Sequence, residues 1–399
     1  MATTRRVYLD HNASAPLLAE AREAMGAVLD LTGNPSSVHA EGRRLRGIVE
    51  EAREDVAALV KALPSQVVFT SGATEANITA LGGGWDWIAL PATEHDSVLA
   101  PARTSGARIV NVPVGRAGVV TSDELTAVLA ATPGLSGRRV AAVQLANNET
   151  GVLQPVAALV AAARTHGFAF HTDAVQAAGR IAIDFNALGA DTMALSAHKL
   201  GGPKGIGALI IRDGVEIAPL ITGGGQERRR RAGTENVAAI AGFGAAARIA
   251  AARLAGDARV AALRDRLEAA LLALTPAATI FGTGAARLPN TTCIGVAGRA
   301  SDITVIKLDV AGFAVSAGSA CSSGRVAMSH VLAAMGADAQ AARGAIRISI
   351  GHETTAAEID AFTGVWAALH ESEPGSAWRT ETVIETRGQP HMGTSAIGE

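Results

Sequence analysis

Short apolar runs alternate with longer stretches whose apolar positions recur every three or four residues over the first half of the chain. The runs are typical of strands and the stretches of helices, for example over residues 122–131 and 156–166. This alternation predicts an α/β fold, with a mainly parallel seven-stranded sheet that is covered by helices and that binds ligands at the carboxyl ends of its strands. The expected strands are residues 66–70, 87–90, 108–112, 140–145, 168–172, 191–195 and 206–211.

The pattern changes after residue 236. Residues 237–274 are rich in alanine and helical in period, without a strand, so a domain junction is expected inside this stretch. The following strands and helices predict a smaller α+β domain; the strands are expected at residues 278–282, 291–296, 313–316 and 346–350 and the helices at 301–310 and 355–369. We therefore expect a large domain over residues 16–255, a small domain over 1–15 and 256–373, and a polar, flexible tail over 374–399.

Composition excludes several classes of protein. The net charge of −2 gives no general attraction to nucleic acid or to an anionic membrane. No apolar run reaches the roughly 18 residues of a membrane span, and the first residues lack the apolar core of a signal peptide. Two cysteines, Cys293 and Cys321, form neither a disulfide framework nor a metal-binding spacing. We expect a cytoplasmic protein without a resident metal.

Lysine is rare in this chain, and one lysine stands at the end of an expected strand. Lys199 follows Ser196 and His198 directly after the run at 191–195. The amine of such a lysine can form a Schiff base with a carbonyl group once its pKa is lowered. The alternative is a surface lysine with a solvated head, which suits Lys61, Lys204 and Lys307 better.

Two further strand ends carry polar residues. The segment 70–77 includes Ala73 and Thr74 and opens a helix, where free N–H groups bind anions or are simply capped. Asp173 follows the strand at 168–172 and either holds a protonated ring nitrogen or caps a turn, with Gln176 three residues on. An anion site, an acid and an amine at three strand ends together indicate a pocket for pyridoxal 5′-phosphate (PLP).

Three more residues fit such a pocket. His95 follows the strand at 87–90 and is either a ring that stacks on the cofactor and moves protons or a surface histidine. Asn148 follows another strand and either binds a ligand oxygen or marks a turn. Arg347 is a lone charge in an apolar strand, so it needs a carboxylate, from the protein or from a substrate.

Two loops have unusual composition. Cys321 stands among small and polar residues, which favours a reactive thiol, whereas Cys293 stands in an apolar strand. The segment 223–234 is rich in glycine and arginine but has no aromatic residue, so a solvated charge run is favoured over a nucleic-acid site. A third interpretation is a loop that carries Arg231 or Thr234 to an anion.

These segments together resemble the cysteine desulfurases of the NifS/IscS group, in class V of the fold-type I PLP enzymes. The resemblance spans residues 8–369. It is carried by Tyr8-Leu-Asp10, Gly33-Asn-Pro-Ser36, Phe69-Thr-Ser-Gly-Ala-Thr-Glu75, Thr93-Glu-His95, Asn147-Asn-Glu149, His171-x-Asp173-x-x-Gln176, Ser196-x-His-Lys199, Gly202-Pro-Lys-Gly-Ile-Gly-Ala208, Arg231-x-Gly-Thr234, Gly318-Ser-Ala-Cys321 and Ile346-Arg-x-Ser349.

The resemblance implies a role for each site residue. Lys199 would bind PLP covalently, Asp173 would pair with its ring nitrogen, Gln176 with its ring hydroxyl, and His95 would stack on it and move protons. The phosphate group would lie against Ala73, Thr74, Ser196 and His198, and Thr234 would reach the phosphate of a partner subunit in a homodimer. The substrate carboxylate would meet Arg347, Asn148 and Asn34.

The implied reaction converts L-cysteine to L-alanine. Cys321 would take the sulfur as a persulfide and pass it to an acceptor such as an iron–sulfur cluster scaffold, where it would touch a cluster during transfer. A class V aminotransferase or a selenocysteine lyase is the alternative enzyme, and an inactive scaffold for cluster assembly is the non-enzyme alternative. The acceptor, a nitrogenase-dedicated or housekeeping role, and the role of the tail stay open.

Overall fold

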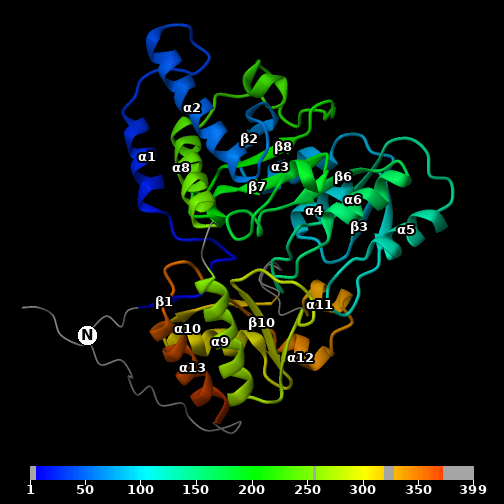
Figure 1. Cartoon of the computed structure of the whole chain (residues 1–399), viewed down its shortest axis with the longest axis vertical. Helices are drawn as coiled ribbons and strands as arrows, with labels where there is room; N and C mark the ends of the chain where they lie inside the picture. Colours follow the sequence, from blue (N-terminus) through cyan, green and yellow to red (C-terminus); the bar gives the residue numbers. More distant parts are fainter. Residues whose placement is uncertain (1–5, 255–257, 319–327, 372–399) are drawn as a thin grey trace, which may run out of the picture.

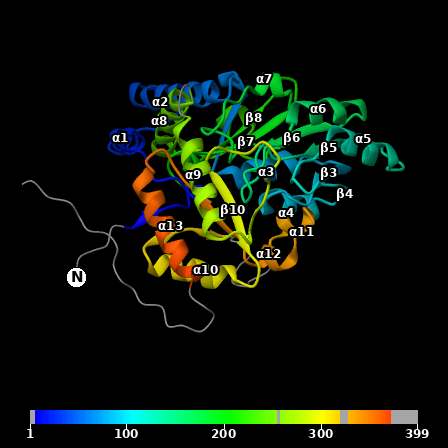
Figure 2. The same cartoon turned by 60° about the horizontal axis from the view of Figure 1, so that its bottom comes forward.

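A computed structural model of the chain describes residues 6–254, 258–318 and 328–371 (Figure 1). Within them, the segments rich in β-branched residues form two main sheets, each with helices on both faces (Figures 1 and 2). None of the described helices is both long and apolar enough to cross a lipid bilayer. Residues 255 and 256, where the domain boundary is expected, and the tail at 374–399 lie outside the described residues. The division into domains therefore stays a prediction.

The larger sheet has seven strands in the order β2-β8-β7-β6-β5-β3-β4. Strands β3 to β7 pair in parallel, and only β8 runs antiparallel to both its neighbours, β2 and β7. All seven predicted strands are present, with ends that differ by a few residues at most: β2 Val67–Thr70, β3 Trp87–Pro91, β4 Arg108–Val112, β5 Arg139–Ala142, β6 Ala169–Asp173, β7 Thr192–Ser196 and β8 Gly207–Ile211.

Helices cover both faces of this sheet because its strands are apolar on both sides. One face carries α2 (Ala40–Leu59), α5 (Ser122–Ala131), α6 (Val156–Thr165) and α8 (Val237–Arg253), which contribute to a single large core. The other face carries α3 (Ala73–Leu81) and α4 (Asp96–Thr104) (Figure 2). Helix α1 (Ala19–Leu29) packs against α8 (Figure 1).

The smaller sheet has the order β12-β13-β10-β9 and is antiparallel. Its strands are β9 (Ala278–Ile280), β10 (Thr291–Val296), β12 (Ser316–Ala317) and β13 (Ile346–Ser349). Helices α9 (Arg259–Leu274), α10 (Ser301–Val310) and α13 (Ala356–Glu371) share one apolar core with it, while α11 (His330–Ala334) and α12 (Ala339–Arg343) pack around the buried Cys293 on the other face.

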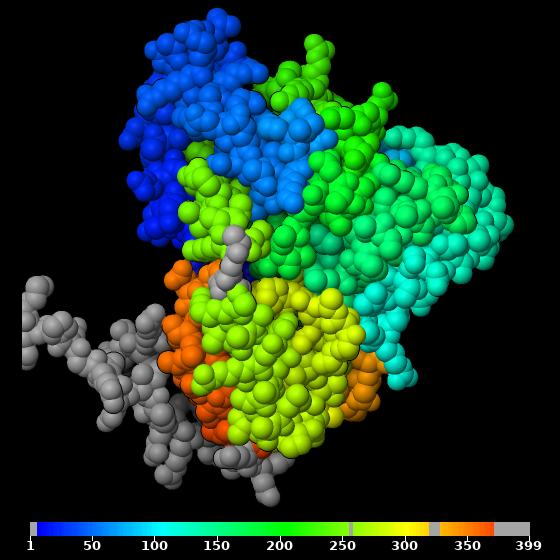
Figure 3. Space-filling model, viewed as in Figure 1, coloured from blue at the N-terminus to red at the C-terminus, as the bar shows by residue number. Residues whose placement is uncertain are grey.

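The start of the described chain lies with its C-terminal third. Strand β1 (Val7–Tyr8) pairs in parallel with β11 (Phe313–Ala314), and Asp10 forms a bridge with Ser349. In the space-filling view the smaller unit, coloured mostly yellow-green to red, lies against the larger unit, coloured blue to green with a yellow-green α8 (Figure 3). The segment after β1 therefore passes between the two units on its way to α1.

Candidate active site

A cavity of about 520 Å³ lies where the carboxyl ends of the central strands meet the N-terminal segment and β13. Ten of the residues predicted from the sequence line it: Ala73, Thr74, His95, Asn148, Asp173, Gln176, Ser196, His198, Lys199 and Arg347. They come from six separate segments of the chain. The strands of the larger sheet bring five of these segments to one edge, as expected for an α/β fold, and β13 of the smaller sheet adds Arg347.

Lys199 ends a single 3₁₀ turn, Ala197–Lys199, that follows strand β7. Its Nζ donates hydrogen bonds to the carbonyl oxygens of Asn12 at 2.5 Å and Ala13 at 3.0 Å. Two backbone carbonyls thus hold the amine at the wall of the cavity. Sequence reasoning missed the N-terminal segment as part of the site, because it lies more than 180 residues away in the chain.

Asn12 fastens this N-terminal segment to both units. Its amide nitrogen donates to the carbonyl of Asn148 at 3.2 Å and to Oγ1 of Thr291 at 2.9 Å. Its backbone N–H donates to Oγ of Ser349 at 2.9 Å. All four residues are buried, so these bonds form in a region of low dielectric where they hold the segment firmly.

Asp173 ends strand β6 and is buried at the floor of the cavity. Its Oδ1 accepts the backbone N–H of Val175 at 2.9 Å, and its Oδ2 accepts Nδ2 of Asn77 at 2.8 Å. Both partners are neutral, so the negative charge of Asp173 has no cation bonded to it among the described residues. A buried carboxylate in this state is suited to bind a protonated ring nitrogen.

His95 is the N-cap of α4, and its Nδ1 accepts the backbone N–H of Ser97 at 3.1 Å. Burial lowers the pKa of His95 below its ordinary value, because desolvation disfavours the imidazolium; Asp173 opposes this shift and Lys199 adds to it. The ring is therefore neutral at neutral pH.

The start of α3 forms a cradle beside Lys199. Gly72 is its N-cap, and a Cβ placed on Gly72 would meet no other atom within 4 Å, so there is open space next to the first N–H groups of the helix. A Cβ on Gly207, in contrast, would lie 2.8 Å from the Cα of Gly72, so β8 must have glycine there for this turn to fit. Ser196 and His198 lie on the same cavity wall. Such a helix start suits an anion.

Arg347 in β13 is buried, and it meets a carboxylate of the protein. Its Nη2 donates to Oδ1 of Asp10 at 2.9 Å and its Nη1 to the carbonyl of Asn148 at 3.0 Å. Of the two alternatives left open by the sequence, the structural carboxylate is therefore present. Nε of Arg347 and Oδ1 of Asn148 are nevertheless buried without a partner among the described residues.

Gln176 and Arg180 lie behind Lys199. Nε2 of Gln176 donates to the carbonyl of Asn12 at 3.1 Å, and its Oε1 accepts Nη1 of Arg180. Arg180 also donates to the carbonyls of His11 at 3.1 Å and Lys199 at 3.5 Å. Burial, followed by the nearby Arg347, lowers the pKa of Arg180 to about 9. This guanidinium ties together the backbone and side chains that surround the amine.

Two predicted residues are not brought to the cavity. Asn34 closes a turn, with its Oδ1 accepting the N–H of Ser36 at 2.9 Å, so nothing within one chain supports a substrate role for it. Thr234 is exposed outside the cavity, and its predicted role in a partner subunit stays a prediction. Cys321 lies outside the described residues.

The loop that carries Thr234 is anchored at two points. Arg53 makes two hydrogen bonds to the buried Glu227, at 2.7 and 2.8 Å, and Arg231 pairs with Glu75 of α3 at 3.0 Å. Part of the arginine-rich run is thus structural, and the interpretation as a purely solvated charge run is wrong for Arg231.

Other lining residues were missed. Lys204 is exposed yet lines the mouth of the cavity, although the sequence favoured an ordinary surface lysine. Ser97 lies in the first turn of α4, and the sequence gave no signal for it. Among the described residues, no three His, Cys, Asp or Glu side chains gather as metal ligands.

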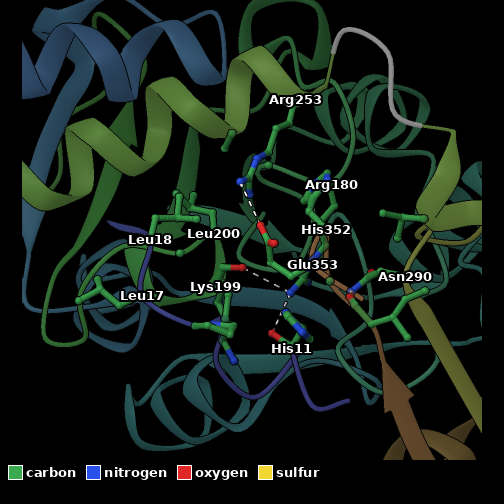
Figure 4. Close-up of a pocket in the computed structure, with 18 of the residues that line it drawn as sticks. His11, Leu17, Leu18, Arg180, Lys199, Leu200, Arg253, Asn290, His352 and Glu353 are labelled. Atoms are coloured by element: carbon green, nitrogen blue, oxygen red, sulfur yellow. Dashed lines mark hydrogen bonds and ion pairs between the residues drawn. The ribbon is translucent and has the colours of Figure 1, made fainter. Parts of the chain in front are cut away.

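A second cavity, of about 440 Å³, lies on the other side of Lys199 (Figure 4). Leu17, Leu18 and Leu200 form part of its wall, and Arg253 pairs with Glu353 at 3.7 Å across it. Its lining includes the start of α1, Leu18 to Glu20, and it shares only Lys199 with the first cavity. The residues predicted to hold the phosphate and the ring nitrogen, Thr74 and Asp173 among them, line the first cavity.

Comparisons with known proteins agree with this arrangement. Residues 7–362 match the family model for class-V aminotransferases. The chain is 44% identical over 370 residues to a cysteine desulfurase of Cereibacter sphaeroides, covering 89% of this chain and 93% of that protein. The chain belongs to the cysteine desulfurases of the class-V aminotransferase family.

Other members of the family are also similar over most of their length. An IscS-like cysteine desulfurase of Mycobacterium tuberculosis is 38% identical over 371 residues, 89% of this chain and 93% of that protein. The structure of a NifS-like protein from Rickettsia africae superposes with a TM-score of 0.85 at 33% identity, covering 92% of this chain and all of that one. The structure of SspA in complex with cysteine has a TM-score of 0.74 at 30% identity, with 86% and 98% of the two chains covered.

Proposed function

We propose that the chain is a PLP-dependent cysteine desulfurase that converts L-cysteine to L-alanine and transfers the sulfur to Cys321. The observation that carries the proposal is the meeting of Lys199, Asp173 and His95 with the start of α3 in one cavity. An amine, a buried acid, a flat ring and an anion cradle are the groups that a PLP enzyme requires.

The residues present fit the cofactor. Asp173 would pair with the ring nitrogen, since its bonded partners are neutral. The first turn of α3, with Ser196 and His198, would hold the phosphate, and Lys199 would bind the aldehyde carbon. When bound, PLP supplies an electron sink for the carbon skeleton of the substrate.

The chain's own residues would prepare the substrate. Arg347 and Asn148 both line the cavity, and Nε of Arg347 is a buried donor without a partner among the described residues. This donor supports the proposal that a substrate carboxylate binds there, with Asp10 holding the guanidinium in place. Lys199, once displaced, would move the substrate's α-proton.

The sulfur of L-cysteine would be transferred to Cys321. Its thiolate attacks the sulfur of L-cysteine, so that an S–S bond forms and the C–S bond breaks with its electron pair left on carbon. A proton then completes L-alanine, and the enzyme holds a persulfide. Cys293 is a poor candidate for this step, because it is fully buried in an apolar cluster that raises the pKa of its thiol.

The proposal also covers the oligomeric state of the enzyme and the acceptor of its sulfur. The exposed Thr234, on its doubly anchored loop, supports a homodimer in which each subunit contributes to the other's phosphate site. The IscS-like relatives support an iron–sulfur cluster scaffold as the acceptor. The cytoplasmic location expected from the sequence stays a prediction.

Substitution of the two cysteines tests the proposal. Cys321→Ser is expected to lower sulfide release from L-cysteine by at least about a hundredfold, because no thiolate remains to take the sulfur. The visible absorption of bound PLP should persist. Cys293→Ala is the matched control and should keep its activity within a few-fold. Unchanged sulfide release by Cys321→Ser would refute the assignment.

A further inference from the structure

Two donors from one residue point at Nδ1 of His95. The backbone N–H of Ser97 lies 3.1 Å from this nitrogen, and Oγ of Ser97 lies 2.8 Å from it. A backbone amide can only donate, so Nδ1 must offer it a lone pair. The hydrogen of the neutral ring is then bound to Nε2, the other ring nitrogen.

Asn77 sets the direction of the Ser97 hydroxyl. Its Nδ2 lies 2.8 Å from Oδ2 of Asp173 and 2.9 Å from Oγ of Ser97. Since a carboxylate only accepts hydrogen bonds, the NH₂ side of Asn77 must face Asp173, and its second hydrogen points at Ser97. The Ser97 hydroxyl is thus an acceptor toward Asn77 and is left to donate to His95.

The other side of the Asn77 amide is held as well. Nε2 of His171 lies 2.9 Å from Oδ1 of Asn77, and Nδ1 of His171 lies 2.9 Å from Oγ1 of Thr192. Burial lowers the pKa of His171 to about 4, so its ring is neutral and donates only from Nε2. Both Asn77 and His171 are fully buried, and the amide has no alternative orientation that satisfies all its partners.

We infer that Asn77 and Ser97 are positioning residues that hold His95 as the neutral imidazole with its proton on Nε2. This inference rests on the function proposed above, in which His95 works beside the cofactor. The chain of bonds cannot act as a proton wire, because the Asn77 amide has no proton that it can give up. Nε2 of His95 then carries a hydrogen, so this nitrogen can donate a hydrogen bond and has no lone pair with which to act as a general base.

The charged groups around His95 come from several segments. Asp173 and Asp96 favour the imidazolium, whereas Lys199 and His330 disfavour it, as does burial. All of these are retained when Ser97 is replaced by alanine, so this variant isolates the hydroxyl. Because the hydroxyl stabilises only the neutral ring, its loss should raise the protonated fraction of His95 about fivefold at any pH above the midpoint.

Long-range ¹H–¹⁵N NMR of the full-length enzyme with ¹⁵N-labelled histidine tests the inference, and His95→Gln assigns the signals. The wild type should show His95 neutral with its proton on Nε2 at neutral and higher pH. Ser97→Ala should titrate at higher pH, and Ser97→Thr should restore the wild-type curve. The hydroxyl of Ser105 donates to the carbonyl of Ala102 at the far end of α4. In the control variant Ser105→Ala, His95 should therefore titrate as in the wild type.

A wild-type ring with its proton on Nδ1 would overturn the inference, as would identical titration of wild type and Ser97→Ala. The NMR readout does not depend on turnover. A correct tautomer without sulfide release would refute the proposed function alone, and sulfide release with the wrong tautomer would refute this inference alone.

Discussion

The two cavities that meet at Lys199 differ in how their polar groups are satisfied. In the part of the chain that the structure describes, Asp173 of the first cavity has only neutral partners, and Arg347 and Asn148 have buried atoms without any. In the second, Arg180 bonds only to oxygens of the protein and Arg253 to Glu353. The volumes, about 520 and 440 Å³, are similar and do not separate them. Unmet polar groups, more than empty space, indicate where a ligand binds.

The same contrast separates the two sides of Lys199. Its Nζ is held by the carbonyls of Asn12 and Ala13, while its own carbonyl accepts a bond from Arg180, which lines the second cavity. The amine and its backbone thus face different neighbours. Chemistry is expected on the amine side, and support for the backbone on the other.

Replacement of the lysine should give the largest effect. Lys199→Ala is expected to lower the rate of sulfide release by at least about a thousandfold and to remove the visible absorption of the lysine-bound cofactor, because no other amine holds its position. Lys204→Ala is the matched control, since Lys204 lines the same cavity at its mouth. Steady-state kinetics and absorption spectra of both variants provide the measurement. Retention of the absorption band by Lys199→Ala would mean that another lysine binds the cofactor.

A large side chain placed in the first cavity should weaken PLP binding, whereas one placed in the second should not. Both effects should be smaller than that of Lys199→Ala. Thr74 and Leu17 are both exposed residues that line one cavity each. Thr74→Trp should weaken PLP binding at least about tenfold, because the indole occupies the anion cradle. Leu17→Trp should change PLP affinity and kcat/KM less than about threefold. Cofactor titration by fluorescence compares the two, and a larger loss in Leu17→Trp would reverse the assignment of the cavities.

Much of the site could be predicted because α/β sheets gather strand ends. Lys199 and Asp173 follow predicted strands, and the parallel pairing of β6 and β7 alone places them together. The antiparallel direction of β8 could not be read in this way, since an apolar strand carries no sign of its direction.

The residues behind the site were not predicted, for two physical reasons. Asn12 contacts Lys199 only in the folded chain, and no local sequence pattern predicts a contact between residues that are 187 positions apart. Asn77 and Ser97 are buried polar residues of α3 and α4. A hydrophobic pattern identifies the apolar residues that are buried, but it does not identify the polar residues that are buried beside them. The substrate role of Asn34 stays a prediction, since its side chain closes a turn and does not line the cavity.

The most direct test of the central claim is the balance of products from L-cysteine. The purified enzyme, given L-cysteine and a reductant that releases persulfide sulfur, should form L-alanine and sulfide in equal amounts over many turnovers. Both products are measured in the same reaction. Formation of the keto acid of cysteine in a reaction that requires an added amino-group acceptor would contradict the account and favour an aminotransferase, and alanine without sulfide would contradict the predicted sulfur balance.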